Sequence, residues 1–148
     1  MSQSFDIETF VRAAADAIIA AGADGTIIFW NPAATRIFGF SADEALGQSL
    51  DLIIPERFRA RHWDGYRQVM VTGETKYAAD VLRVPAVHKD GRALSIAFTV
   101  SLMDAPDGNG RVIAAIVRDE TQRWNEEREL RRRLAELEQQ AKSALPSA

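Results

Sequence analysis

Residues 94–102 read Leu-Ser-Ile-Ala-Phe-Thr-Val-Ser-Leu, which is the clearest strand pattern in the sequence. Apolar side chains occupy every second position, and small or polar ones fill the positions between them. Because successive side chains of a strand point to opposite faces, this alternation predicts a strand with one face against a core. Asp-Gly pairs at 90–91 and 107–108 bracket the stretch. Such pairs favour hairpin turns, which need positive φ, so we expect an antiparallel meander.

The neighbouring segments complete a sheet. Residues 77–87 and 111–118 are predicted to be the strands that the two turns join to the central one. Two more apolar runs, at 17–21 and 26–30, are separated by another Asp-Gly turn. Pro85 places the 77–87 strand at an edge or a bulge of the sheet, because proline cannot donate a ladder hydrogen bond.

Three short helices are predicted between the second and third strands. Asn31-Pro32 begins the first, since Asn accepts a hydrogen bond from a free amide and Pro suits the first helical position. Ser41 and Glu44 form a capping box for the second. The third runs from 55 to about 71. Its apolar side is predicted to face inward and comprises Phe58, His62, Tyr66, Val69 and Met70.

The order of these elements predicts the fold class. It is α+β, with a five-stranded antiparallel sheet, short helices on one face and a further helix after the last strand. A short helix over residues 6–15 precedes the first strand. The space between the sheet and the helices is where a ligand cavity is expected.

The chain changes character after Asp119. This residue, with Gln122 at the third helical position, is predicted to cap a new helix. Beyond it apolar residues recur at alternating steps of four and three, as in a coiled-coil seam. They are Leu130, Leu134, Leu137, Ala141 and Ala144. Because two heptads are too short to form a stable coiled coil alone, we expect the folded domain to seed it. The seam has no expected partner within the chain, so we predict a homodimer in which the N-terminal helix and this seam pair with a second copy.

Composition narrows the function. The 148 residues carry a net charge of −3, which argues against nucleic-acid binding, and no cysteine, which excludes thiolate chemistry and disulfides. No apolar run is long enough to span a membrane, and the first nine residues are polar and acidic, so we expect a cytoplasmic protein. Phosphate-binding loops, His-based metal pairs and nucleophile elbows do not occur, and an enzyme is not expected.

Eight short motifs then occur in a characteristic order. They are Asp24-Gly25-Thr26-Ile27, Trp30-Asn31-Pro32-Ala33-Ala34, Phe38-Gly39-Phe40-Ser41, Glu44-Ala45-Leu46-Gly47, Ile54-Pro55-Glu56, Thr72-Gly73-Glu74, Lys89-Asp90-Gly91 and Arg118-Asp119-Glu120-Thr121. Each is only a turn or a cap, but their order and spacing resemble those of the PAS domain family. The resemblance covers residues 8–121. It implies a sensory or pairing module that works with a histidine kinase, a cyclase or a transcription regulator.

The resemblance also divides the chain. Residues 1–20 hold the N-terminal helix and the first strand, 8–121 the PAS domain and 122–148 an amphipathic signalling helix. Asp119 and Thr121 match the junction from which the signalling helix of the family emerges.

His62 is the residue with the most specific functional hypothesis. Its surroundings resemble the haem-binding PAS domains of FixL-type oxygen sensors, in which a His on this helix is the axial ligand of haem b. The resemblance implies a role for Arg83 beside a haem propionate, and places Tyr66 on the same helix as the ligand. It implies a ligand-side lining of Ile96, Phe98, Val100, Ile113, Ala115 and Val117. Trp63 departs from the haem pattern, and the alternative interpretation of His62 is a packed histidine.

Two functions stay open at this point. One is a sensor that binds a small ligand or responds to a redox or gas signal, and reports it through the C-terminal helix. The other is a ligand-free dimerisation module. Flavin photochemistry is disfavoured because no cysteine can form the adduct, and His88, beside a hairpin turn, is expected at the surface.

Overall fold

The sheet has five antiparallel strands in the spatial order β2-β1-β5-β4-β3, in a computed structural model that describes residues 4–75 and 79–145. The strands are β1 (Ala17–Ala21), β2 (Ile27–Trp30), β3 (Leu82–Val87), β4 (Ala93–Asp104) and β5 (Arg111–Asp119). The predicted α+β fold is confirmed. Pro85 lies in β3, an edge strand, as its missing amide hydrogen requires.

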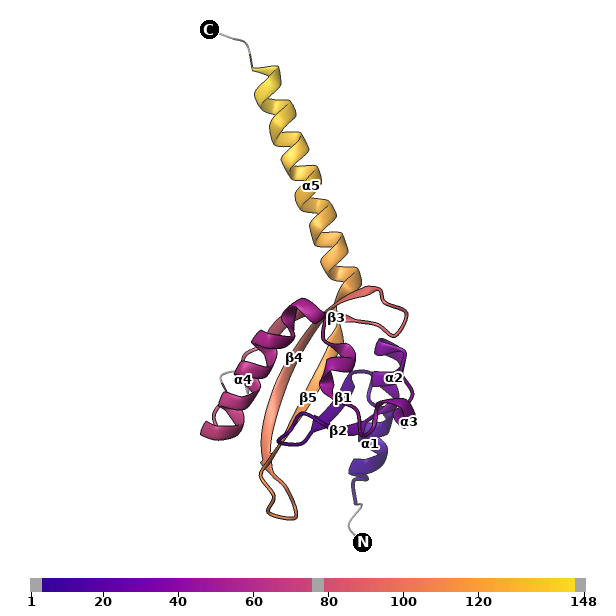
Figure 1. Ribbon diagram of the computed structural model, residues 1–148. Helices are drawn as coiled ribbons and strands as arrows, with labels where there is room; N and C mark the ends of the chain where they lie inside the picture. Colours follow the sequence, from indigo (N-terminus) through magenta and orange to yellow (C-terminus); the bar gives the residue numbers. More distant parts are fainter. Residues whose placement is uncertain (1–3, 76–78, 146–148) are drawn as a thin grey trace.

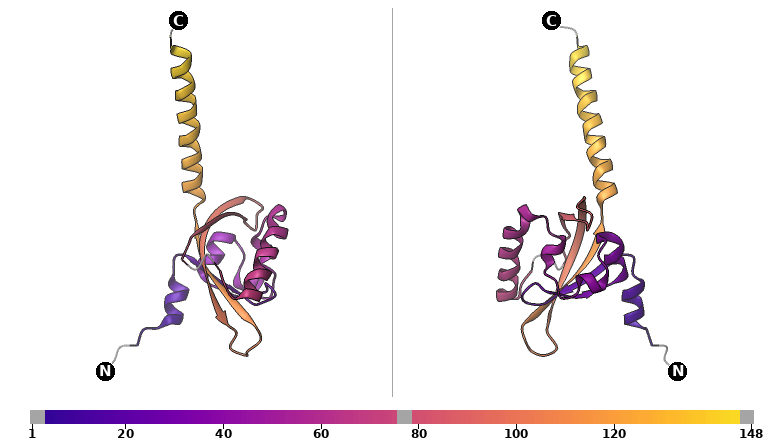
Figure 2. Two further views of the ribbon diagram at one scale, coloured as in Figure 1. Left: turned by 90° about the vertical axis from the view of Figure 1, so that its left-hand side faces the viewer. Right: turned by 45° about the vertical axis from the view of Figure 1, so that its right-hand side comes forward.

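The helices lie between β2 and β3 and at both ends of the chain. They are α1 (Ile7–Ala13), α2 (Pro32–Phe38), α3 (Ala42–Ala45), α4 (Arg59–Thr72) and α5 (Thr121–Ala144), with 3-10 turns η1 (Leu50–Ile53) and η2 (Glu56–Phe58). In Figure 1, α5 leaves the globular part as one long helix. Both views in Figure 2 place α1 and α4 on opposite sides of the sheet.

Two predicted boundaries differ most from the observed ones. The helix predicted from residue 55 starts as the 3-10 turn η2, and α4 itself begins at Arg59. The strand predicted from residue 77 begins at Leu82, while residues 77 and 78 lie outside the described part of the chain. Local patterns define the centres of elements better than their ends, where turns and caps compete.

Asn31 joins three elements of the fold. Its Oδ1 accepts from the amide of Ala34 at 3.1 Å, as predicted for a helix cap, and also from the amide of Ile18 at 2.9 Å. Its Nδ2 donates to the carbonyl oxygens of Val11 and Asp16, at 2.9 and 3.2 Å. The side chain is almost fully buried, and these four bonds satisfy it. One residue therefore links α1 and the segment after it to β1 and to the start of α2.

The turn between β3 and β4 is attached to α2 and α3. The amide of Lys89 donates to the carbonyl of Phe38 in α2. The ammonium group of Lys89 lies 2.5 Å from the carboxylate of Glu44 in α3. Glu44 also forms the predicted capping box with Ser41. His88 packs so closely on Gly39 (φ +86°) that a Cβ there would lie 2.5 Å from its ring. The expectation that His88 lies at the surface was wrong, because its side chain is only 14% exposed.

Candidate functional site

The predicted ligand-side residues share one face of the sheet. The register pairs Phe98 with Val117 and Val100 with Ala115, and Ile113 follows two residues away on the same face of β5. This is the face that packs against the side chains of α2 and α3. Ile96, Val100 and Val117 are buried, and Phe98, Ala115 and Ile113 are half-buried. The structure thus brings all six residues together.

Arg83 is not part of this set. It pairs with Ala97 across β3 and β4, so its side chain points to the opposite face from Val84 and Ala86, and it is exposed. The role beside a propionate in the inner pocket therefore does not fit its position. A shift of one residue along a strand exchanges the two faces, which is why sequence matching misplaced it.

His62 lies on α4 within a cluster of aromatic rings. Its imidazole is 4.6 Å from the indole of Trp63 and 5.6 Å from the ring of Tyr66, measured between centroids. Its Nδ1 is buried and has no hydrogen-bond partner among the described residues. Burial lowers the pKa of His62, and the charge of Asp51 opposes the shift only in part. The imidazole is therefore neutral near pH 7, with a ring nitrogen available to a ligand.

Two aromatic side chains attach α4 to η1 and to the turn between β1 and β2. The indole nitrogen of Trp63 donates to Asp51 at 2.7 Å, and its ring lies over Gly25, where a Cβ would be 2.2 Å away. The hydroxyl of Tyr66 donates to the carbonyl of Gly22 at 2.5 Å, and burial raises the pKa of Tyr66. Trp63 thus packs on a turn that only glycine at position 25 allows.

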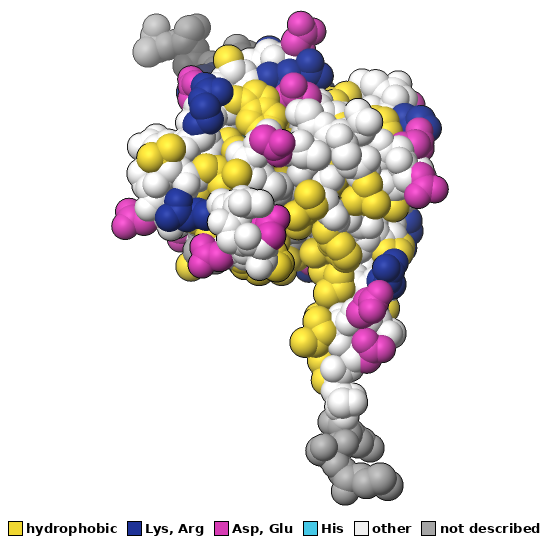
Figure 3. Space-filling model, turned by 60° about the horizontal axis from the view of Figure 1, so that its bottom comes forward, with side chains coloured by type: hydrophobic (Ala, Val, Ile, Leu, Met, Phe, Trp, Pro, Cys, Tyr) yellow, Lys and Arg dark blue, Asp and Glu magenta, His cyan; other side chains and the backbone are white. Residues whose placement is uncertain are grey.

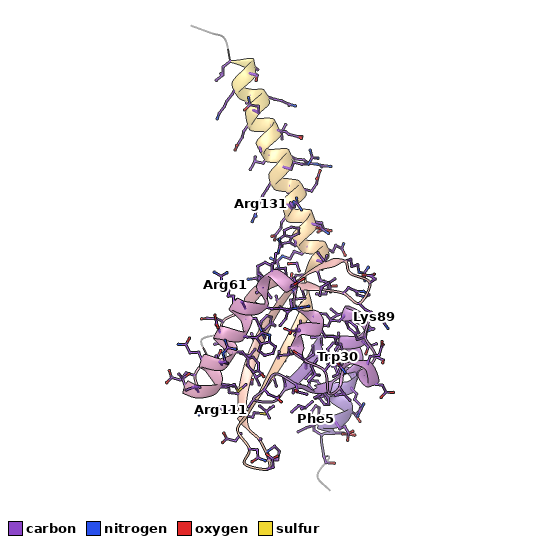
Figure 4. All side chains as sticks on the ribbon, in the orientation of Figure 1. Phe5, Trp30, Arg61, Lys89, Arg111 and Arg131 are labelled. Atoms are coloured by element: carbon purple, nitrogen blue, oxygen red, sulfur yellow. The ribbon has the colours of Figure 1, made fainter. Side chains whose placement is uncertain are left out.

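Arg111 holds the other end of the same helix. Its guanidinium donates to the carbonyl oxygens of Met70 and Val71 in the last turn of α4. It also lies against Gly73, the left-handed residue that ends the helix, where a Cβ would be 2.6 Å from the guanidinium. Arg111 is the first residue of β5, and Figure 4 shows it beside the lower end of α4. The sequence analysis missed this contact, because nothing local marks it.

The predicted junction joins β4, β5 and α5. The hydroxyl of Thr121 accepts from the amide of Ser95 at 3.0 Å, and the amide of Glu120 donates to the carbonyl of Ser95 at 2.8 Å. The amide of Thr121 donates to Asp119 at 2.9 Å. The predicted capping pair was wrong: Glu120 is the cap residue, and Gln122 bonds to Glu126 instead. Asp119 still binds the first amide of α5.

Beyond the junction α5 makes few contacts with the globular part. No described residue of the helix is buried. The predicted seam residues Leu130, Leu134 and Leu137 are 63%, 57% and 61% exposed. These exposed leucines form an apolar stripe along one face of α5.

The comparisons with known proteins now decide the family. The family model for the PAS fold matches residues 6–119. The chain belongs to the PAS family. PAS domains are sensory modules, generally without catalytic activity, and no catalytic family is indicated for this chain.

Three curated relatives contain a similar segment. An uncharacterized protein of Azorhizobium caulinodans is 33% identical over 118 residues, which are 79% of this chain and 16% of that protein. The oxygen sensor protein DosP of Escherichia coli is 29% identical, over 63% of this chain and 11% of DosP. The sensor protein FixL of Bradyrhizobium diazoefficiens is 31% identical, over 83% of this chain and 23% of FixL. The chain therefore spans less than a quarter of each relative.

Solved structures agree on the fold. The PAS domain of a Colwellia psychrerythraea protein superposes with a TM-score of 0.66 at 19% identity, covering 78% of this chain and 94% of that one. A PAS domain from a two-component sensor histidine kinase gives a TM-score of 0.60 at 18% identity, with 75% and 90% covered. At such identities the likeness concerns the fold alone. In the described part of the chain, no helix combines the length and apolar character needed to cross a lipid bilayer.

Proposed function

We propose that this PAS domain is the sensory part of a signalling protein, and that it takes up haem b with His62 as the axial ligand. The observation that carries the proposal is the buried, neutral imidazole whose Nδ1 has no partner in the described chain. A buried polar atom without a hydrogen bond destabilises a fold unless a ligand or another role compensates. The similarity to FixL and to the oxygen sensor DosP supports the same assignment.

The residues of the chain fit this group. His62 supplies the nitrogen donor that haem iron prefers, and burial keeps it unprotonated. The apolar face around Phe98 and Val100 would exclude water from the ligand side. Bound haem would supply an iron with a coordination position for a diatomic gas. Arg83 has no part in this site.

We further propose that Arg111 passes the signal on. It bonds to the end of α4 and begins β5, whose last residue, Asp119, binds the first amide of α5. A shift of α4 on ligand binding would therefore displace β5 and the base of α5 together. Such a change is a population shift between two packings of the same elements.

The partners are a second copy of the chain and an output domain of the histidine kinase, cyclase or regulator type, in the cytoplasm. Support for a second copy comes from exposed apolar residues in the N-terminal arm and in the seam of α5. Phe5, Ile7 and Phe10 are 70%, 67% and 57% exposed in the N-terminal arm. This arm projects in Figure 3 with a band of hydrophobic side chains along it. Support for an output domain is the small fraction of each relative that this chain spans.

A ligand-free pairing module is the second candidate. The observation in its favour is the aromatic contact of His62 with both Trp63 and Tyr66, which fills space beside the imidazole. In that case His62 is a packing residue that binds no ligand. The exposed apolar residues of the N-terminal arm and of α5 would then define the function.

Absorption spectra after reconstitution with haemin separate the two. The wild-type chain should give a Soret band at one haem per chain, and His62→Ala should abolish or shift it. His88→Ala is the matched control and should leave the spectrum unchanged, because His88 packs on Gly39, away from α4. No uptake by the wild type, or equal uptake by His62→Ala, would refute the haem proposal and favour the pairing module.

A further inference from the structure

We infer that Trp63 sets the affinity of the His62 site by covering the imidazole, and that a ligand binds only in molecules whose Trp63 ring has left its place on Gly25. The inference rests on the ligand site of the proposed function, but it does not require that the ligand be haem. Trp63 is a residue to which the proposed site gives no role.

The imidazole of His62 lies between two rings of its own helix. Trp63 meets it edge-on, with 4.6 Å between ring centroids and 80° between the ring planes, and Tyr66 lies 5.6 Å away. Trp63 and Tyr66 also contact each other, at 5.2 Å. The Nδ1 of His62 is buried beside this cluster, without a hydrogen-bond partner among the described residues. A ligand that approaches this nitrogen must therefore move part of the cluster.

Trp63 is the ring of this cluster that moves with the smaller loss. Tyr66 is buried, and its hydroxyl donates to the carbonyl of Gly22. Trp63 is only half-buried, and its indole nitrogen donates to the carboxylate of Asp51, whose side chain is 40% exposed. Water can therefore hydrate this carboxylate once the indole has moved away.

The covering position of Trp63 is well defined. Its ring fills the space above Gly25, where a Cβ would lie 2.2 Å from the indole. The turn that holds Gly25 is joined to η1, because the amide of Leu50 donates to the carbonyl of Gly25 at 3.0 Å. Asp51, the hydrogen-bond acceptor, follows directly in η1. The space for the ring and the acceptor for its nitrogen are therefore fixed relative to each other.

This cover selects among ligands. A hydrogen bond to a carboxylate is strong enough to favour the covered state at least about tenfold. The apparent affinity of any ligand is then reduced by the fraction of molecules that are open. An apolar molecule would only replace the contacts of the indole, whereas a metal centre forms a coordinate bond with the imidazole. The covered site therefore favours a ligand that carries a metal over an apolar one.

Reaction with diethyl pyrocarbonate tests the cover without any ligand. The reagent acylates neutral imidazole, and burial lowers the pKa of His62, so that its ring is neutral near pH 7. Trp63→Phe cannot donate to Asp51, and its His62 should react at least about tenfold faster than that of the wild type. His88, the other histidine of the chain, falls in a different tryptic peptide and should react at an unchanged rate.

A double variant tests the hydrogen bond itself. Asp51→Ala removes the acceptor of the same bond and should also speed the reaction of His62. Because one bond is broken in either case, Trp63→Phe/Asp51→Ala should react no faster than the faster single variant. Rates that multiply in the double variant would show that the bond does not hold the cover.

Two glycine variants separate displacement of the ring from backbone strain. Gly25 and Gly47 have φ of +82° and +84°, so alanine is strained at both. A Cβ at Gly47 would have no atom within 4 Å, whereas one at Gly25 would displace Trp63. His62 should therefore react at least about tenfold faster in Gly25→Ala and within about twofold of the wild-type rate in Gly47→Ala. Equal rates in the two variants would contradict the inference, and Trp63→Phe decides if Gly25→Ala does not fold.

Haemin titration separates this inference from the proposed function. Trp63→Phe should bind haemin with an apparent affinity at least about tenfold higher than the wild type, at the same one haem per chain. If neither protein binds haemin but His62 reacts faster in Trp63→Phe, the haem proposal fails and the cover is supported. If His62 reacts equally fast in the wild type and in Trp63→Phe, Trp63 does not cover it and the inference is wrong.

Discussion

The two long helices, α4 and α5, carry apolar residues at helical spacing, yet they are held in different ways. Trp63, Tyr66 and Arg111 bind α4 to η1, to the turn between β1 and β2 and to the start of β5. α5 is held mainly at its base, through Thr121 and its neighbours. Apolar spacing thus predicts a helix and one covered side, but the covering partner is decided by contacts distant in sequence.

The largest expected effect comes from releasing α4. Tyr66→Ala removes a buried ring and should lower the free energy of unfolding by about 3 kcal/mol or more, as large-to-small changes of buried aromatics do. The matched change on α5, Leu134→Ala, should alter it by less than about 0.5 kcal/mol in dilute, monomeric protein. Urea unfolding measures both, and equal losses would contradict the difference between the helices.

Tyr66→Phe refines this comparison. It keeps the ring and removes only the hydroxyl that donates to Gly22, so a loss of about 1 kcal/mol is expected.

The next effect concerns the far end of α4. Arg111→Met removes charged hydrogen bonds to Met70 and Val71 and should cost about 1.5–3 kcal/mol. Hydrogen exchange should quicken in the last turn of α4 and stay unchanged in α5. Arg118→Met, which breaks an exposed ion pair with Asp16, is the control and should cost clearly less than Arg111→Met. Similar losses for both variants would argue against a special role for Arg111.

At the base of α5 the expected effect is smaller. Asp119→Ala removes the acceptor for the first amide of the helix and should cost about 1 kcal/mol. The globular fold should survive, while the helix content of residues 121–140 and dimer formation decrease. Circular dichroism and hydrogen exchange report these changes, and unaltered exchange over these residues would rule out the role of Asp119.

The smallest expected effect is a decrease in the stability of the fold as the pH falls. In the folded protein the pKa of His62 is lowered from its ordinary value of 6.5. The unfolded chain therefore takes up the proton first as the pH falls. The stability that His62 contributes is complete above pH 6.5 and is lost toward its folded pKa. Urea midpoints of the ligand-free protein should show this decline, which should be reduced in His62→Gln and retained in His88→Gln.

Much of the fold could be predicted from the sequence, because the decisive signals are local. The alternation at 94–102 predicted β4, Asn31 the start of α2, and Ser41 with Glu44 the capping box. The six residues predicted to line a ligand share one face of the sheet, because they follow one register, and their role as a ligand lining stays a prediction.

The remainder depended on contacts between distant residues. Tyr66 bonds to a carbonyl 44 residues away, and Arg111 to one 41 residues away. No period or cap marks such pairs. Arg83 was misplaced because its side depends on a single step of register, and His88 because its burial comes from Gly39 on another element.

The central claim is that a ligand at α4 changes the base of α5 through Arg111, and hydrogen exchange with and without haem tests it most directly. In the wild type, haem should alter exchange both in residues 59–72 and in residues 121–128. In Arg111→Met, haem should alter exchange in the first range while the second responds much less. An α5 base that does not respond in the wild type, or responds equally in Arg111→Met, would contradict the account.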